Sequence, residues 1–275
     1  MKFALSFPNF GVFAEPEVLV DLAVRAEDSG WDGFFLWDHI VIADGMPVAD
    51  PWVSLGAIAQ ATDRITLGPM VIALPRHRPW VVARQAVSVD RLSRGRLVLG
   101  VGLGFPPREE FWTFGDPVDL RVRANMLEEG LEIIRGVWSG RPFSFEGEHY
   151  RVETNRFAPP PYRETSIPIW VAGMLPNRRP LRRAARFQGV FPVHGDLAPV
   201  TRDEVKEVKS IVERNREDGR SFDYVITGPP RTAGEYSALE DAGVTWYVGG
   251  PHPEGEPLEE TKDWVSSGPG AYTAG

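Results

Sequence analysis

Strand-like and helix-like segments alternate eight times along the chain, and this alternation restricts the possible folds more than any other feature. The strand-like segments are short and rich in aliphatic and aromatic residues, and they cover residues 2–7, 33–39, 65–73, 96–104, 167–173, 189–193, 222–228 and 244–250. Each is followed by an amphipathic helical pattern, at residues 16–30, 51–63, 79–93, 119–140, 177–187, 201–217, from 232 onward and at 256–267. Several strands are continuously apolar, which is typical of parallel strands covered on both faces.

Eight strand–helix units in a chain of 275 residues predict an α/β fold, a single (β/α)8 TIM barrel over residues 1–275. The alternative is an open doubly wound sheet, in which strands and helices also alternate. The barrel is favoured because no glycine-rich nucleotide-binding turn follows the first strand. A hairpin at about residues 142–153, turning at Glu146 and Gly147, is expected before the fifth strand.

The composition excludes several kinds of site and partner. A formal net charge of −8 argues against a nucleic-acid or anionic-membrane surface, which needs a basic patch. The chain has no cysteine, which excludes disulfides and thiolate sites, and its five scattered histidines lack the paired spacing of metal ligands. We therefore expect no bound metal. Because no apolar run suits a signal peptide or a membrane span, we expect a cytoplasmic protein.

The run FFLWDHI (34–40) ends the second strand in an acid and an imidazole, Asp38 and His39. In a (β/α)8 barrel the carboxyl ends of the strands carry the active site, so both side chains are candidates for catalysis. A histidine titrates near neutral pH and can donate or accept a proton at a bound ligand. The structural alternative is a histidine satisfied by backbone groups, with Asp38 capping a loop.

The end of the third strand is irregular. Gly68 and Pro69 within a strand pattern indicate a bulge or distorted backbone. Arg76, His77 and Arg78 follow in the loop, where they could meet an anionic substrate or remain solvated.

Two glycine-containing turns are candidates for ligand contact. Gly100, Gly102 and Gly104 form a G-x-G-x-G run that lacks the spacing of a dinucleotide fingerprint and favours close packing of a planar ligand on bare backbone. A loop that needs positive φ angles is the alternative. After the fifth strand, the segment WVAGMLPN (170–177) leads into a predicted helix whose first amides could bind phosphate, unless the turn is an ordinary one with surface arginines.

Taken in order, these segments resemble the luciferase-like family of flavin and deazaflavin oxidoreductases. The resemblance rests on LVDLAVRAEDSGWDGFFLWDHI, RITLGPMVIALPRHRPWVVARQAVSVDRLSRGRLVLGVGLG, GLEIIRGVWSG with FSFEGEHYRV, and PIWVAG, and it covers residues 3 to about 195. The second of these stretches is the most specific, whereas the last 80 or so residues match mainly in layout.

The resemblance implies a luciferase-like barrel whose cofactor ring lies across its carboxyl-end mouth. A non-prolyl cis peptide supports the ring in that family, and the corresponding bond here joins Met70 and Val71. The family's second-strand histidine, here His39, faces the ring or the substrate. The turn after the fifth strand holds the cofactor phosphate, which assigns this role to Gly173 and Met174.

The chain departs from the family pattern at two positions. Only residues 228–231 separate the seventh strand from its helix, where many relatives have a long lid, and this weakens a monooxygenase function unless segment 105–119 covers the site. Known deazaflavin dehydrogenases carry a catalytic glutamate directly after the glycine run, whereas this chain has Phe105 there, with Glu109 and Glu110 farther on.

We therefore expect an oxidoreductase that uses FMN or, alternatively, coenzyme F-420 for hydride transfer or monooxygenation of a small organic substrate. The ring is expected near Met70, Val71, Gly102 and Gly104, with His39 oriented by Asp38 as the proton donor or hydrogen-bonding group. A non-catalytic flavin-binding barrel and a flavin-free isomerase or aldolase are the rival functions. The aromatic residues around the mouth suit a flat or apolar substrate, and the resemblance implies a homodimer through the second and third helices.

Overall fold

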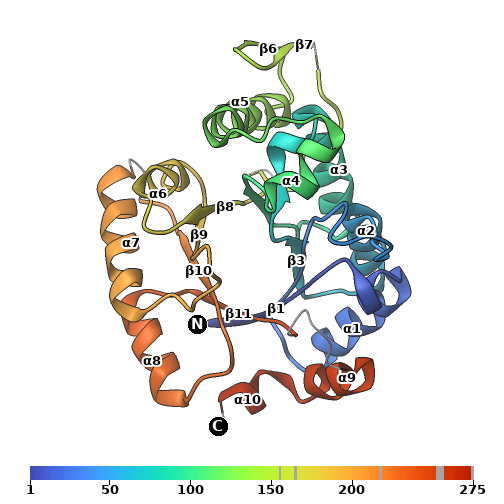
Figure 1. Ribbon diagram of the computed structural model, residues 1–275, viewed down its shortest axis with the longest axis vertical. Helices are drawn as coiled ribbons and strands as arrows, with labels where there is room; N and C mark the ends of the chain where they lie inside the picture. The colour runs from blue at the N-terminus through green and yellow to red at the C-terminus, as the bar shows by residue number, and fades with distance from the viewer. Residues whose placement is uncertain (155, 164–165, 217–218, 252–256, 274–275) are drawn as a thin grey trace.

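Parallel strands form the centre of the molecule and helices surround them (Figure 1). The computed structural model describes residues 1–154, 156–163, 166–216, 219–251 and 257–273, and the side chains of residues 271–273 are outside the description. In chain order the barrel strands are β1 (Lys2–Phe7), β2 (Gly33–Leu36), β3 (Thr66–Pro69) with its continuation β4 (Ile72–Ala73), β5 (Leu99–Gly102), β8 (Ile169–Met174), β9 (Gly189–Val193), β10 (Asp223–Thr227) and β11 (Trp246–Gly249).

The strands run in the order β3-β2-β1-β11-β10-β9-β8-β5-β4, and each named pair in this order is parallel. The two ends of the order are joined, because Leu67 of β3 bonds to the segment before β5: its N–H donates to the Arg96 carbonyl at 3.2 Å, and its carbonyl accepts from the Val98 N–H at 2.9 Å. The sheet is therefore a nearly closed barrel. This confirms the predicted (β/α)8 architecture and excludes the open sheet.

The helices lie where the apolar periodicity predicts them, with ends shifted by a few residues. They are α1 (Pro16–Asp28), α2 (Pro51–Ala61), α3 (Pro79–Leu92), α4 (Pro107–Glu110), α5 (Leu120–Trp138), α6 (Arg178–Ala184), α7 (Arg202–Asn215), α8 (Ala233–Ala242), α9 (Leu258–Ser266) and α10 (Gly268–Thr273). Short 3-10 helices lie at Gly11–Phe13, Leu74–Arg76 and Trp112–Phe114. The sequence patterns did not predict α4 or α10.

Two apolar layers hold the barrel together. The larger layer fills the space between the strands and the outer helices and includes Leu22, Ile58 and Leu127, each fully buried. The second layer fills the barrel interior with residues of neighbouring strands, among them Phe35, Trp170 and Trp246. Because neighbouring residues of a strand point to opposite faces, the apolar residues of one strand divide between the two layers.

The predicted hairpin forms, with β6 (Phe143–Glu146) antiparallel to β7 (Arg151–Thr154). It stands at the end of α5, apart from the barrel (Figure 1). Glu129 of α5 binds the turn, since its carboxylate accepts from the N–H groups of Glu148, His149 and Tyr150 at 2.8 to 3.3 Å.

Within the described residues, we find no helix that combines the length and the apolar character needed for a membrane crossing.

Candidate active site

The second strand ends earlier than the sequence predicts, so the two candidate residues follow it in a loop at the carboxyl end. β2 stops at Leu36, and Asp38 and His39 lie two and three residues beyond it. The Asp38 carboxylate is almost completely buried and accepts hydrogen bonds from the Ala73 N–H at 3.0 Å and from Nε2 of His77 at 2.9 Å. The loop after β2 is therefore fastened to the segment after β4, its neighbour at the mouth.

His39 does not use Asp38 as its hydrogen-bond partner. Its Nδ1 lies 3.1 Å from Oε1 of Glu110, a residue of the short helix α4. A carboxylate oxygen accepts hydrogen bonds, so Nδ1 carries the hydrogen and Nε2 has the free lone pair. The prediction that Asp38 orients His39 is wrong, because Glu110 performs this role while Asp38 contacts Arg76 and His77.

Glu110 is buried, and its charge is shared by several donors. Besides His39 it accepts from the N–H groups of Ile40, at 3.1 and 3.2 Å, and Val41, at 3.3 Å. Nη1 of Arg76 also contacts its second carboxylate oxygen. These contacts fix α4 against the loop after β2, so the segment that follows β5 lies at the mouth of the barrel.

Arg76 connects the two buried carboxylates. Nη2 lies 2.7 Å from Oδ2 of Asp38 and donates to the Asp38 carbonyl at 2.9 Å, while Nη1 contacts Glu110. The Arg76 side chain is only 2% exposed. Arg76 is thus held by Asp38 and Glu110, and Nε2 of His77 is held by Asp38, so these two side chains are neither free nor fully solvated, whereas contact with an anionic substrate stays untested.

Burial sets the protonation states in this cluster. It lowers the pKa of His39 to about 4, while Asp38 opposes this shift and Arg76 reinforces it. For Asp38, burial alone would raise the pKa, but His77, Arg76 and the Ala73 N–H outweigh burial and lower it. At neutral pH His39 is therefore uncharged, and Asp38 is a carboxylate paired with the Arg76 guanidinium.

The peptide bond between Met70 and Val71 is cis, as the resemblance implies, and it separates β3 from β4. The adjacent strand β5 approaches it closely. A Cβ atom at Gly100 would lie 2.4 Å from the Pro69 carbonyl oxygen, and one at Gly102 would lie 2.8 Å from Cγ2 of Val71. The first two glycines of the run thus allow β5 to pack against the protein's own cis segment, so their contact with a ligand stays a prediction.

Only glycine fits at position 104, the third glycine of the run, for two reasons. Its φ angle is +79°, and a Cβ atom there would lie 2.7 Å from Cζ of Phe111. The positive φ turns the chain from β5 into α4, which brings Glu110 back over the mouth.

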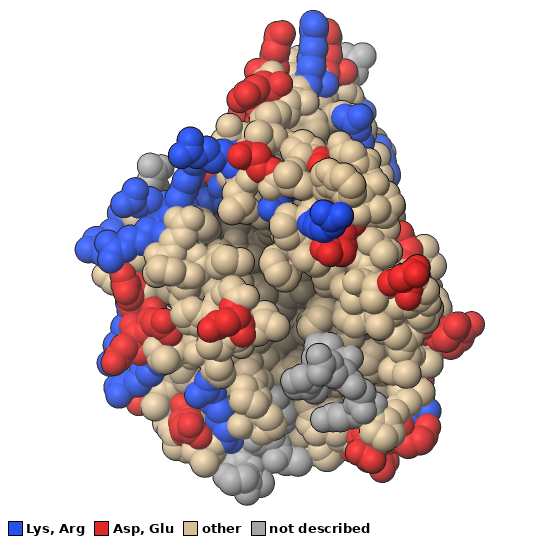
Figure 2. All heavy atoms as spheres, in the orientation of Figure 1, with Lys and Arg blue, Asp and Glu red and all other residues tan. Residues whose placement is uncertain are grey.

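Within the described residues, small side chains form the floor of the mouth. Val71, Ala172 and Val193, at or near the ends of their strands, are partly exposed and pack on the interior layer below them. Figure 2 shows a central hollow here, bordered mainly by uncharged residues. This shallow apolar floor fits a flat heteroaromatic ring, which a plugged barrel would exclude.

The two residues expected to bind the cofactor phosphate are the last two of β8, directly before the turn that leads to α6, and not in that turn. Gly173 is buried, where a Cβ atom would lie 2.8 Å from Cβ of Pro180, and Met174 is half exposed. Just before α6, the side chain of the N-cap residue Asn177 already accepts from the Arg179 N–H at 3.0 Å. The helix is also only seven residues long, so the phosphate role of Gly173 and Met174 stays a prediction.

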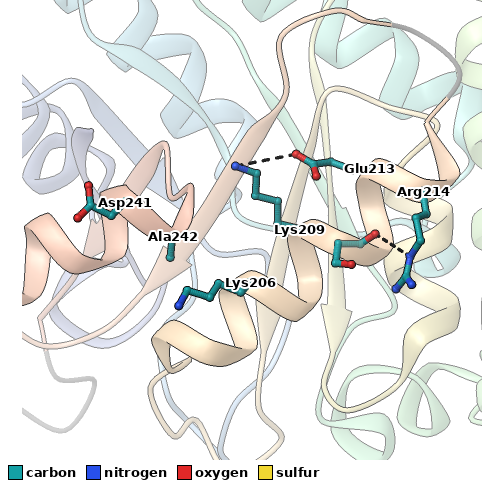
Figure 3. A pocket seen from close by; sticks show the side chains of 7 residues that line it. Lys206, Lys209, Glu213, Arg214, Asp241 and Ala242 are labelled. Atoms are coloured by element: carbon teal, nitrogen blue, oxygen red, sulfur yellow. Dashed lines mark hydrogen bonds and ion pairs between the residues drawn. The ribbon is translucent and has the colours of Figure 1, made fainter.

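Two grooves lie elsewhere on the described surface, and neither contains residues of the cluster described above. The larger, of about 450 Å³, lies between α7 and α8 and is lined by Lys206, Lys209, Ser210, Glu213, Arg214, Asp241 and Ala242 (Figure 3). Lys209 faces Glu213 across 3.9 Å, and Arg214 donates to the Ser210 carbonyl at 3.1 Å. Lys209 and Arg214 thus contact residues of their own helix on the outside of the barrel, where no strand end contributes chemistry.

In the described part of the chain, no group of three His, Asp or Glu side chains is arranged to hold a metal ion. His252, one of the five histidines considered, lies outside the described residues.

Comparison with known proteins identifies the family. A family model described as luciferase-like monooxygenase matches residues 3–268. The chain belongs to this family. An uncharacterised protein of Mycobacterium tuberculosis is 34% identical over 226 residues, which cover 78% of this chain and 74% of that protein. An F420-dependent glucose-6-phosphate dehydrogenase of Nakamurella multipartita is 34% identical over 202 residues, 70% of this chain and 59% of the dehydrogenase.

Solved structures of other luciferase-like proteins share the fold. A monooxygenase from Streptomyces bottropensis superposes with a TM-score of 0.80 at 20% identity and covers 96% of each chain. An F420-dependent secondary alcohol dehydrogenase, solved with an F420-acetone adduct, gives a TM-score of 0.79 at 16% identity and covers 95% of this chain and 96% of that one. The present chain is therefore an oxidoreductase or monooxygenase of a family that uses flavins or deazaflavins.

Proposed function

We propose that this luciferase-like protein transfers a hydride between coenzyme F-420 and a small substrate that carries a hydroxyl or carbonyl group. One observation carries the proposal: His39 is uncharged, Glu110 fixes its Nδ1–H, and Nε2 makes no hydrogen bond to the protein within the described residues. A free imidazole lone pair at the mouth accepts the hydroxyl proton when an alcohol is oxidised, and returns it when a carbonyl is reduced. His39 is the catalytic residue, and Asp38 and Glu110 hold its loop in place.

The cofactor supplies the hydride chemistry when it is bound. We place its ring on the apolar floor beside Met70, Val71, Gly102 and Gly104, and its phosphate at Gly173 and Met174. Arg179 and Arg182 of α6 are exposed and have no acidic partner in the described part of the chain, and positive charge gathers over this helix (Figure 2). Coenzyme F-420 carries carboxylates beyond its phosphate, whereas FMN ends at the phosphate, so these arginines favour F-420.

A spectroscopic experiment tests the proposal. The purified protein is titrated anaerobically with F-420 and with FMN, and the F-420 complex is then mixed with a panel of primary and secondary alcohols. We expect F-420 to bind more tightly and an alcohol to bleach its visible absorbance. His39→Ala is expected to retain cofactor binding and lose at least about a hundredfold in turnover. Equal turnover by wild type and His39→Ala would refute the assigned role.

The second candidate function is monooxygenation with reduced FMN. It is favoured by the contacts of Glu110 with Ile40, Val41 and Arg76, because they hold segment 105–119 at the mouth, where it could exclude water from a reactive intermediate. The short connection at residues 228–231, without a lid, argues against it. Product formation that requires both reduced FMN and oxygen would establish this function in place of the first.

We also propose a homodimer through α2 and α3. Val53 is 65% exposed, and Val81 and Leu92 on α3 are 46% and 44% exposed, so the two neighbouring helices present apolar side chains outward. Light scattering coupled to size-exclusion chromatography is expected to give twice the mass of one chain. Val53→Glu with Val81→Glu is expected to yield the monomer.

A further inference from the structure

Asn9, the second residue after β1, has a completely buried side chain that binds the main chain of His39. Its Oδ1 accepts from the His39 N–H at 3.1 Å, and its Nδ2 donates to the His39 carbonyl at 2.9 Å. Within the described residues, no other group hydrogen-bonds the main chain of His39. One side chain therefore fixes the peptide groups on both sides of the imidazole.

The same residue closes the loop that follows β2. Nδ2 of Asn9 also donates to the Ala49 carbonyl at 2.7 Å, and the Asn9 carbonyl accepts from the Ala49 N–H at 2.8 Å. Segment 39–49 thus begins and ends at Asn9, while its middle, residues 43–47, is exposed. Because both ends of the loop are held at one buried point, the position of His39 does not depend on the exposed middle.

The three side-chain hydrogen bonds require an amide at position 9. Two N–H bonds of the Asn9 amide point at carbonyl oxygens, and its oxygen faces an N–H group. An ionised aspartate of the same shape only accepts, so its charge would face the carbonyl oxygens of His39 and Ala49. An alanine would leave these buried groups unpaired, which is costly.

Other contacts hold the imidazole ring of His39. Nδ1 faces Oε1 of Glu110 at 3.1 Å, and the rings of Phe10 and Trp37 lie edge-on to the imidazole, with centroids 5.6 and 6.0 Å away. Phe10 follows Asn9 directly, so the segment after β1 contacts both the main chain and the ring of His39. A proton acceptor must lie within about 3 Å of the proton donor, so a small displacement of this ring lowers the rate of transfer strongly.

Resting on the proton transfer assigned to His39 above, we propose that Asn9 is a positioning residue, which holds His39 so that Nε2 points to the bound substrate. Asn9 is buried and does not touch the reacting atoms. It acts through the main chain of His39, whereas Glu110 acts through the ring. Loss of Asn9 should therefore reduce kcat and leave cofactor affinity unchanged.

Kinetics and NMR together test the assignment. With F-420 and the best alcohol of the panel above, Asn9→Ala is expected to lower kcat about tenfold to a hundredfold, with little change in KM or F-420 affinity. In spectra of ¹⁵N-labelled histidine without cofactor, the pKa of His39, about 4 in the wild type, should rise toward 6.5 because the released loop exposes the imidazole to water.

Thr62→Ala is the matched control. The Thr62 hydroxyl donates to the Ile58 carbonyl at 2.7 Å and accepts from Arg96 at 2.9 Å, and the residue precedes β3, at the amino end of the strands. Its loss should lower the melting temperature while kcat and the titration of His39 stay at wild-type values.

Asn9→Asp gives a result that a general loss of stability does not produce. When protonated, the introduced carboxyl can accept from the His39 N–H and donate to one of the two carbonyls, and when ionised it repels both. The kcat of this variant should therefore fall with rising pH through one new ionisation that wild type and Asn9→Ala lack. The charged groups that face His39, Asp38, Arg76 and Glu110, are the same in all of these proteins.

The outcomes separate the role of Asn9 from the reaction. A shifted His39 titration in Asn9→Ala, without reduction of F-420 by any alcohol in the wild type, would support the role of Asn9 and overturn the hydride-transfer function. Wild-type kcat and His39 titration in a folded Asn9→Ala would overturn the inference, as would an equal loss of kcat in Thr62→Ala. If Asn9→Ala does not fold, Asn9→Asp decides, and a pH profile identical to that of the wild type overturns the inference.

Discussion

Oε1 of Glu110 lies 3.1 Å from Nδ1 of His39, although 71 positions separate the two residues in the chain. This contact determines which nitrogen of the imidazole is available to a ligand, and it also fixes α4 at the mouth. Glu110 is therefore a positioning residue for His39.

Replacing Glu110 by Gln is expected to lower kcat about tenfold to a hundredfold with little change in cofactor affinity. The amide oxygen still accepts from Nδ1, but the charge that pairs with Arg76 is lost, so the free energy of unfolding also falls, by about 3 kcal/mol. Long-range ¹⁵N NMR spectra of labelled histidine report the tautomer directly. Glu109→Gln, which changes the neighbouring carboxylate, is the control and should show wild-type kinetics and tautomer. A wild-type rate for Glu110→Gln would contradict the assigned role.

The lowered pKa of His39 predicts a pH dependence of stability. Above about pH 6.5, His39 is uncharged in both the folded and the unfolded chain and contributes no slope. As the pH falls from 6.5 to about 4, the unfolded chain takes up a proton that the folded chain does not, so the free energy of unfolding decreases. The decrease is at most about 3 kcal/mol, at roughly 1.4 kcal/mol per pH unit.

His39→Asn isolates this contribution, because the Asn amide can still donate to Glu110 but does not titrate. Protonation of other acidic groups also lowers the free energy of unfolding in acid. The relevant quantity is therefore the difference in free energy of unfolding between wild type and variant at each pH. Urea unfolding from about pH 7.5 down to about pH 4.5 should show a shallower loss for the variant. Parallel curves for the two proteins would mean that His39 is not buried in its neutral form.

Removing the charges of Arg179 and Arg182 should weaken cofactor binding. We expect Arg179→Gln with Arg182→Gln to lower the affinity for F-420 about threefold to tenfold at low salt, and to have a smaller effect on FMN. The difference should disappear at high salt, because screening weakens exposed charge interactions. Arg141→Gln, an exposed arginine beside the hairpin, is the control for net charge. Calorimetric titrations at two salt concentrations measure the effect, and equal losses for F-420 and FMN would argue against contact with the additional carboxylates.

Gly68 is required for barrel closure. A Cβ atom at this position would lie 1.9 Å from the Val98 carbonyl oxygen, at the point where β3 meets the start of β5. Gly68→Ala is therefore expected to reduce the free energy of unfolding by about 2 kcal/mol or more. Gly56→Ala is the matched control, since nothing lies within 4 Å of the added carbon and the residue is inside α2, where Ala should stabilise by about 0.5 to 1 kcal/mol. Urea unfolding of the two variants should give changes of opposite sign.

Local patterns were sufficient to predict the barrel elements because each depends on interactions close in sequence. The capping boxes at Thr201 and Thr232 begin α7 and α8 where Thr-x-x-Glu predicts them. The predicted strand at 65–73 is interrupted, but at Met70 and Val71, directly after Gly68 and Pro69, which lie within β3. The cis bond after Met70 agrees with the family resemblance. The prediction failed for β2, whose last predicted residues lie in a loop, because period-2 patterns do not reveal where ladder hydrogen bonds stop.

Local patterns could not predict which side chains contact each other in the candidate site. Asp38 and His39 are adjacent in the chain, which suggested that one orients the other, yet their side chains make separate contacts with Arg76 and Glu110. In the sequence, Glu110 is one of two adjacent glutamates a few residues beyond the glycine run, and nothing there indicates its contact with His39. The positive φ of Gly104 and the short helix α4 bring it back to the mouth, and no sequence periodicity records that return.

By itself the sequence determined which segments become strands and helices and that eight of them alternate, because hydrophobic period, caps and turns act over a few residues. It also placed Asp38 and His39 at the carboxyl end of a strand. Only the tertiary structure decided that Glu110 holds His39 and that Arg76 is shared by two acids, because burial and charge pairing depend on which distant segments meet.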